Sequence, residues 1–167
     1  MTGSPLNHCL KVLVETEGDI AKSKDLLRKR GLADAEKRSD RLATEGLIGL
    51  NDDQSGQKVT MVQFSCETDF VAKTDRFQDG LNEILDTIHA HDMNIGSQLS
   101  SDTSFIEDYA RQMQMLRSVD PDVSTQTMEE AIKFTGAKTQ ENCQLARIFK
   151  SSWDSSRGEV AQTYLHN

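Results

Sequence analysis

A change of hydrophobic period in the first half of the chain most strongly constrains the fold. From Thr60 to Cys66 apolar and polar side chains alternate, as in a strand with one buried face. From Phe77 to Ile88 apolar residues recur at three- and four-residue spacing, as on one face of a helix. The sequence therefore predicts a chain in which a β-hairpin and helices share one core.

The segment before this change, residues 1–46, is predicted to form three short helices. The first has an apolar stripe at helical spacing: Leu6, Cys9, Leu10 and Leu13. The second starts after an N-cap at Asp19 and ends at Gly31, where basic residues in the last turn precede a glycine. The third, weakly amphipathic, spans residues 33–43.

The remaining elements are predicted from shorter signals. A hairpin runs from Leu47 through a turn at 51–56 to Cys66. Residues 91–130 are acidic and interrupted by turn signals, so we expect a solvated excursion with one helix. The apolar stripe of that helix is Ile106, Tyr109, Met113 and Leu116. A helix at 127–134 and a closing hairpin of 143–153 and 159–165 follow.

Charge and apolar content exclude several functional classes. The formal net charge is −8, and all of the acidic excess lies after residue 48. Without a basic stripe, direct nucleic-acid binding is not expected. No apolar run reaches the roughly 20 residues of a membrane helix, so no membrane association is expected. The cysteines, Cys9, Cys66 and Cys143, are odd in number and far apart, which favours a reducing compartment over disulfides.

The sequence has no recognisable catalytic or metal-binding motif. It lacks a glycine-rich phosphate loop, a nucleophile elbow and a Cys-x-x-Cys pair. His89 and His91 diverge on a helix, which favours a polar helix end over a metal site. Cys66 shares the apolar strand face, which favours a buried thiol over a nucleophile. We therefore expect no enzyme activity, no cofactor and no metal.

The segment Thr68-Asp69-Phe70-Val71 stands where the strand period changes to the helical one. Strand ends usually turn with small or polar residues, whereas here an aromatic follows a carboxylate directly. From the residues alone, a Phe70 buried under the following helix is favoured. The alternative is an aromatic anchor offered to a partner.

The run CETDFVAK at residues 66–73, followed by Phe77-Gln78, closely resembles the signature of elongation factor Ts. This family comprises the guanine-nucleotide exchange factors of elongation factor Tu in bacteria, mitochondria and plastids. Weaker matches follow in the family's order: Thr2-Gly3, Cys9-Leu10-Lys11-Val12-Leu13, Glu17-Gly18-Asp19-Ile20, residues 27–32, Glu45-Gly46-Leu47-Ile48, Glu141-Asn142 and Tyr164-Leu165-His166. The resemblance thus spans nearly the whole chain and is weakest at 91–130.

The resemblance implies an α+β protein. A three-helix, ubiquitin-associated-like (UBA-like) domain would occupy residues 1–46, and the first, incomplete part of an antiparallel-sheet-plus-helices core would occupy 47–167. The turn Thr68-Asp69-Phe70-Val71 would bind elongation factor Tu in its GDP-bound and nucleotide-free states. Asp69 and Phe70 would disturb the partner's magnesium and phosphate site, while Leu6 and His166 would make further contacts.

The chain departs from the family pattern at three places. Leu10 replaces a lysine, Thr139-Gln140 replaces Ile-Gly, and Leu145 replaces one arginine of a pair. Family members continue beyond the position of Asn167, so we expect a fragment or a reduced form.

Two further expectations concern function and location. The main rival function is a UBA-like adaptor that binds proteins without exchange activity. An enzyme built on Cys66 or on the His89 cluster ranks third. The stretch at residues 45–50 and the insertion before the final hairpin resemble mitochondrial members. We therefore expect the mitochondrial matrix, with the bacterial cytoplasm as the alternative.

Overall fold

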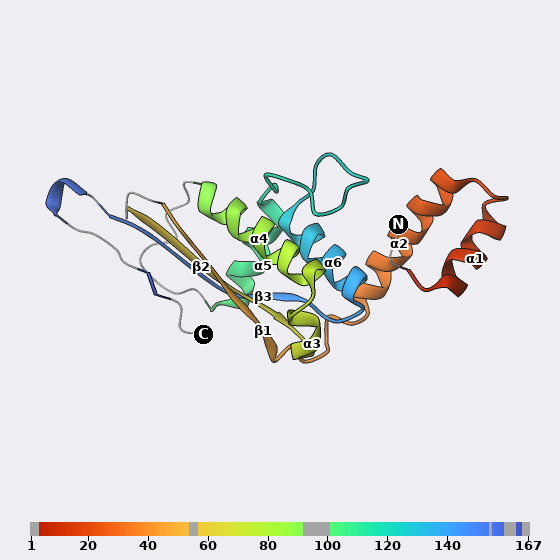
Figure 1. The fold of residues 1–167 in the computed structure, drawn as a ribbon, viewed down its shortest axis with the longest axis horizontal. Coiled ribbons are helices and arrows are strands. Elements are labelled where there is room, and N and C mark those ends of the chain that lie inside the picture. Colours follow the sequence, from red (N-terminus) through yellow and green to blue (C-terminus); the bar gives the residue numbers. More distant parts are fainter. Residues whose placement is uncertain (1–3, 54–56, 92–100, 154, 159–162, 165–167) are drawn as a thin grey trace.

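A three-stranded antiparallel sheet forms the base of the protein (Figure 1). The computed structural model describes residues 4–53, 57–91, 101–153, 155–158 and 163–164. The strands are β1 (Glu45–Asp52), β2 (Lys58–Cys66) and β3 (Gln144–Ser152), in the order β1-β2-β3. The predicted hairpin is confirmed, with the two ends of β1 and β2 paired as Glu45 opposite Cys66 and Asp52 opposite Val59.

Helices cover the sheet and complete an α+β fold, as predicted. Those that contact its strands are α3 (Asp69–Ala72), α4 (Asp75–Ala90) and α5 (Thr103–Gln112), while α6 (Met128–Thr139) packs on the helices. Helix α4 packs on β1 and β2, α5 packs beside β3, and α6 contacts both helices. Gly80 of α4 lies so near α6 that an added Cβ would stand 2.6 Å from Thr135 Oγ1, so this crossing requires a glycine.

The core lies between β2 and α4. Phe64 and Phe77 are fully buried and stack with ring centroids 4.6 Å apart. Other side chains buried in this core come from β2, α4, α6 and β3: Val62, Ile84, Ile88, Met128 and Ile148. Each such side chain contributes roughly 1.5–3 kcal/mol through burial, which makes this interface the main source of stability.

The acidic excursion is only partly as predicted. It contains the one expected helix, α5, but this helix is not merely solvated, because Ile106, Tyr109 and Met113 are buried in the core. Leu116, expected on the same stripe, is 55% exposed. The reason is that the helix ends at Gln112, after which the backbone pairs with residues before α6.

The N-terminal segment forms two helices within residues 4–46, α1 (Leu6–Glu15) and α2 (Ile20–Glu36). The predicted N-cap is present, since Asp19 Oδ1 accepts from the Lys22 N–H at 3.0 Å. The predicted helix end at Gly31 and the separate helix at 33–43 are wrong. Helix α2 instead continues through Gly31 to Glu36 and packs on α6, where a Cβ at Gly31 would make an ordinary contact, 3.4 Å from Ala137 Cβ.

The remaining predicted elements have mixed outcomes. The helix expected at 127–134 is α6, which starts with a capping box between Thr127 and Glu130 and continues to Thr139. The first half of the closing hairpin is β3. Its second half, 159–165, lies mostly outside the described residues. The division into domains 1–46 and 47–167 stays a prediction. Among the described helices, none combines the length and apolarity needed to cross a membrane.

Gln140, just after α6, has a strained backbone conformation whose cost can be measured. Its φ is 62°, in the left-handed region that costs a non-glycine residue about 1–2 kcal/mol. We expect Gln140→Gly to raise the free energy of unfolding by about 0.5–1 kcal/mol, as measured by urea denaturation. Gln140→Ala is the matched control, because it removes the same side chain without relieving the backbone. Equal unfolding free energies of the two variants would show that the left-handed backbone at Gln140 is not strained.

Candidate functional site

The turn between β2 and α4 carries four of the six predicted site residues. Thr68 caps α3, because its hydroxyl accepts from the Val71 N–H at 3.3 Å. The Cys66 thiol donates to the Thr68 carbonyl at 3.1 Å. A second cap at Thr74 starts α4 only a few residues later. Two threonine caps in succession thus make α3 a single fixed turn of helix.

Phe70 projects from this turn into solvent. Its side chain is 79% exposed, whereas Val71 packs against the core and Ala72 is buried. The interpretation favoured from the residues alone, a buried Phe70, is therefore wrong. Helix α3 has only four residues, so when Val71 and Ala72 face the core, Phe70 faces away from it. An exposed aromatic on a fixed turn can serve as an anchor for a partner.

Asp69 is exposed beside Phe70 and pairs with Lys73. Its carboxylate lies 2.8 Å from the Lys73 ammonium, one helical turn away. The hydrogen bond from Lys73 is the main cause that lowers the pKa of Asp69, and the same bond raises the pKa of Lys73. Asp69 is therefore ionised at neutral pH, and its exposed charge is paired with that of Lys73.

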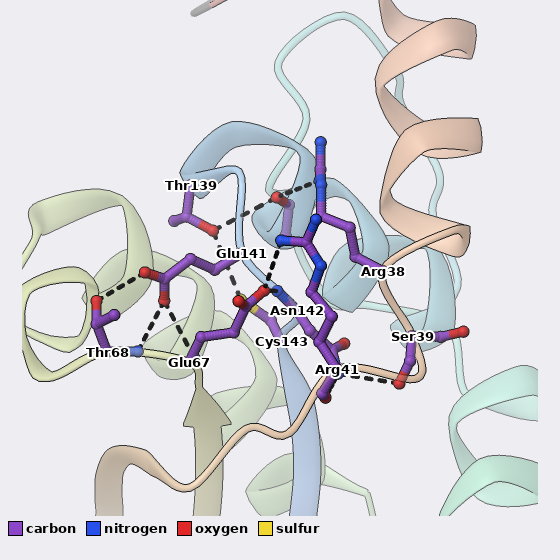
Figure 2. A network of polar contacts seen from close by, with 10 residues as sticks. Arg38, Ser39, Arg41, Glu67, Thr68, Thr139, Glu141, Asn142 and Cys143 are labelled. Carbon is purple, nitrogen blue, oxygen red and sulfur yellow. Dashed lines mark hydrogen bonds and ion pairs between the residues drawn. The ribbon is translucent and has the colours of Figure 1, made fainter.

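Hydrogen bonds to Glu141, called the Glu141 clasp below, hold the turn at Glu67 and Thr68 (Figure 2). The Glu141 carboxylate accepts from the N–H groups of Glu67 and Thr68 at 3.1 and 3.0 Å, and from the Thr68 hydroxyl at 2.6 Å. These three donors come from a segment more than seventy residues earlier in the chain. The loop after α6 thus fixes the backbone on which Phe70 stands.

Reciprocal contacts extend this clasp to the linker after α2 (Figure 2). Glu67 Oε1 accepts from the Asn142 N–H at 2.7 Å and lies 3.4 Å from an Arg41 guanidinium nitrogen. The Asn142 side-chain amide donates to the carbonyls of Ser39 and Arg41 at 3.0 and 2.6 Å. One short loop therefore joins the turn, the start of β3 and the linker.

The other two predicted site residues lie elsewhere. Leu6 is 73% exposed on α1, in the helical hairpin at the opposite end of the molecule from the sheet (Figure 1). Leu10 and Val14 on the same helix are 53% and 80% exposed, so α1 presents an apolar face. His166 lies outside the described residues. The structure thus brings together Thr68, Asp69, Phe70 and Val71, but not Leu6.

The cysteines and histidines show no catalytic arrangement among the described residues. Burial raises the pKa of the Cys66 thiol to about 11, assisted by the nearby Glu141 charge. His89 Nδ1 lies 3.0 Å from Thr60 Oγ1, and burial lowers the pKa of His89. Across the described ranges, no group of three His, Cys, Asp or Glu residues could hold a metal ion.

A cavity of about 480 Å³ lies between α2, α5, α6 and the start of β3. Its charged lining is already paired, since Lys133 lies 2.6 Å from Glu36 and 3.1 Å from Glu129. Its apolar lining includes Ile106, Ile132 and Leu145. This arrangement gives no indication of a cofactor, because a charged cofactor would have to displace existing ion pairs.

Sequence reasoning missed the role of Glu141 and Lys73. Glu141 matched a family position, but nothing in its local sequence indicates that it reaches Thr68. Lys73 is different, because its spacing of four residues from Asp69 on a predicted helix start could have indicated an ion pair.

Comparison with known proteins assigns the family. The family model for Elongation factor TS matches residues 67–167, which include the turn and the clasp. Elongation factor Ts of Nostoc sp. (strain PCC 7120) is 33% identical over 165 residues, covering 99% of this chain and 47% of the relative. That of Alkalilimnicola ehrlichii is 34% identical over 168 residues, covering 99% and 49%. The chain belongs to the elongation factor Ts family.

Coverage and local similarity differ along the chain. Elongation factor Ts of Desulfovibrio desulfuricans is 48% identical over only 79 residues, which cover 47% of this chain and 28% of the relative. Among the relatives aligned along nearly all of this chain, the shared region is about half of their length. The chain therefore spans about half the length of the curated relatives it matches.

The exposure of Phe70 predicts little effect of its removal on folding. We expect Phe70→Ala to change the free energy of unfolding by less than about 0.5 kcal/mol. Phe77→Ala, the matched control in the core, should cost about 3–5 kcal/mol because Phe77 is fully buried against Phe64. Urea denaturation measures both values. A large loss of unfolding free energy in Phe70→Ala would indicate that Phe70 is buried after all.

The raised thiol pKa values predict selective alkylation. The thiolate is the reactive form, and a pKa of about 11 leaves about one part in a thousand of Cys66 ionised at pH 8. Burial raises the pKa of Cys143 to about 12, which leaves still less thiolate. We expect iodoacetamide at pH 8 to modify Cys9 first in the folded protein, and all three cysteines in urea. Mass spectrometry after proteolysis would show whether Cys66 reacts as fast as Cys9, which would revive a nucleophilic role.

Proposed function

We propose that this chain acts as a guanine-nucleotide exchange factor of elongation factor Tu, without catalytic chemistry of its own. The observation that carries the proposal is the exposed Phe70 on a turn held by both a threonine cap and the Glu141 clasp. A monomeric protein gains no stability from an aromatic that is 79% exposed, so a role in binding accounts for it better.

An exchange factor needs no acid, base or metal. It must bind the nucleotide-free partner more tightly than the nucleotide-bound partner, and by reciprocity the nucleotide weakens binding of the factor by the same ratio. Phe70 would supply affinity as a wedge. The ionised Asp69 beside it would disturb the coordination of magnesium and phosphate on the partner.

Contacts away from the turn would complete the partner surface. Leu6, with its exposed neighbours Leu10 and Val14 on α1, offers an apolar face suited to a second contact. The replacement of lysine by Leu10 makes this face more apolar than the family pattern implies. His166 would make a further contact with the partner, as the sequence resemblance implies.

Nucleotide release tests this proposal. The parent chain should accelerate release of fluorescent GDP from elongation factor Tu, and added magnesium with GDP should displace the chain from the partner. Phe70→Ala should weaken binding by about 2 kcal/mol and slow exchange, because hot-spot truncation removes affinity. Asp69→Asn should reduce exchange more than binding to the nucleotide-free partner.

Controls separate these effects from general loss of charge. Asp79→Asn removes an equal charge from the exposed surface of α4 and should leave both quantities unchanged. Release rates are measured at several magnesium concentrations, and binding to the empty partner is measured separately. Equal exchange by Asp69→Asn and the parent at every magnesium concentration would end the role proposed for the Asp69 charge.

The apolar face of α1 favours a second candidate, a protein-binding adaptor without exchange activity. In that case the chain would bind a protein such as ubiquitin through Leu6 and its neighbours, and Phe70→Ala would leave binding intact. Parallel pull-downs with elongation factor Tu and with ubiquitin distinguish the two functions.

We also propose that the chain works in the mitochondrial matrix. Support comes from the sequence at 45–50 and from the segment inserted before β3, which resemble mitochondrial members. Fractionation of the source cells with an antibody to the chain tests this location. Recovery with a bacterial cytosol would instead support the alternative.

A further inference from the structure

We propose that Glu141 is a positioning residue for the exposed turn, so that it controls exchange without touching the partner. The inference rests on the proposed function, because it concerns how Phe70 is presented. Glu141 holds Thr68, and Thr68 in turn caps the helix that carries Phe70. Exchange activity would therefore depend on a side chain beneath the contact surface.

The two carboxylate oxygens of Glu141 have separate tasks. Oε2 accepts both backbone N–H groups, from Glu67 and Thr68, and so fixes the chain direction at the end of β2. Oε1 accepts the Thr68 hydroxyl at 2.6 Å and so fixes the rotamer of that side chain. A carboxylate is well suited to this position, because all three contacts are donors and it accepts at both oxygens.

The orientation of the Thr68 hydroxyl links the clasp to Phe70. A hydroxyl has one hydrogen, and here that hydrogen is donated to Glu141. Its lone pairs are then directed away from Glu141, where one accepts the Val71 N–H that caps α3. The charge of Glu141 thus favours the hydroxyl orientation that the cap needs, and the two hydrogen bonds strengthen each other.

The backbone at Gln140 explains how Glu141 reaches the turn. Helix α6 ends at Thr139, and the left-handed conformation of Gln140, with φ of 62°, turns the chain sharply. Glu141 then binds the turn, while the next residue, Asn142, binds the linker after α2 and donates its N–H to Glu67. The contacts are reciprocal, so Glu67 and Glu141 each accept from the other's segment.

Glu141→Gln is the test variant, because it keeps size but replaces one acceptor by a donor. If the new NH₂ group takes the place of Oε2, it faces two N–H donors. If it takes the place of Oε1, the Thr68 hydroxyl can no longer donate to residue 141, so it loses the hydrogen bond that fixes its orientation toward the Val71 N–H. Glu129→Gln, on the first turn of α6, is the control for the loss of one glutamate charge at the opposite end of this helix.

Amide hydrogen exchange followed by NMR tests the clasp without a partner. In Glu141→Gln we expect the Glu67 and Thr68 amides to exchange at least about tenfold faster than in the parent, because Glu141 is their acceptor. Amides in the middle of β2 and those of Glu129→Gln should keep the parent's protection. Unchanged protection of Glu67 and Thr68 would overturn the proposal.

Release of GDP from elongation factor Tu then tests the functional link. We expect Glu141→Gln to lower the exchange rate about tenfold or more, since small misplacement of a contact group has effects of that size. In a Phe70→Ala background the same substitution should cause little further loss. An equal loss in both backgrounds, or full activity of Glu141→Gln, would overturn the positioning role.

A second pair of variants covers the case in which Glu141→Gln fails to fold. Thr68→Val removes the hydroxyl at nearly constant volume, whereas Thr68→Ser keeps it. We expect Thr68→Val to lose exchange to the same extent and Thr68→Ser to retain it, and equal activity of the two would contradict the link. If the parent itself does not accelerate release, the proposed function fails, and the amide exchange still decides whether Glu141 positions the turn.

Discussion

The burial of one face of β2 against α4 determines where the exposed turn of this protein lies. Phe64 from the strand stacks on Phe77 from the helix, and both are fully buried. Because few residues separate the end of β2 from the start of α4, the chain must reverse its direction within them. The turn that carries Phe70 is that reversal, so packing of the core brings a rigid, exposed turn to the edge of the molecule.

Much of this arrangement could be predicted from the sequence where the pattern is local. The hairpin and α4 are set by side-chain periods of two and about 3.6 residues, which can be read directly. The helix end predicted at Gly31 was wrong, because α2 continues through this glycine to Glu36 and packs on α6, which lies far along the chain. Long-range partners likewise explain why α5 joined the core instead of remaining solvated.

The site shows the same division between local and long-range information. The turn itself could be predicted from its residues, but those residues alone favoured a buried Phe70, which is wrong. The direction of a side chain on a four-residue helix depends on which of its neighbours face the core. Glu141 could not be assigned a role from sequence, since its three donors lie more than seventy residues away. The contact depends on the pairing of β2 with β3, which places Ser65 opposite Gln144 and so brings the two segments together.

Helix α2 packs on α6 near Gly31, and the rest of the N-terminal hairpin extends away from this contact (Figure 1). Ile20 lies eleven residues before Gly31 on one continuous helix, about 17 Å at 1.5 Å per residue. A tilt of about 10° at the contact with Ala137 would therefore move the end of α2 nearest α1 by about 3 Å. The orientation of α2 on α6 thus sets the distance between the apolar face of α1 and the aromatic ring at the turn.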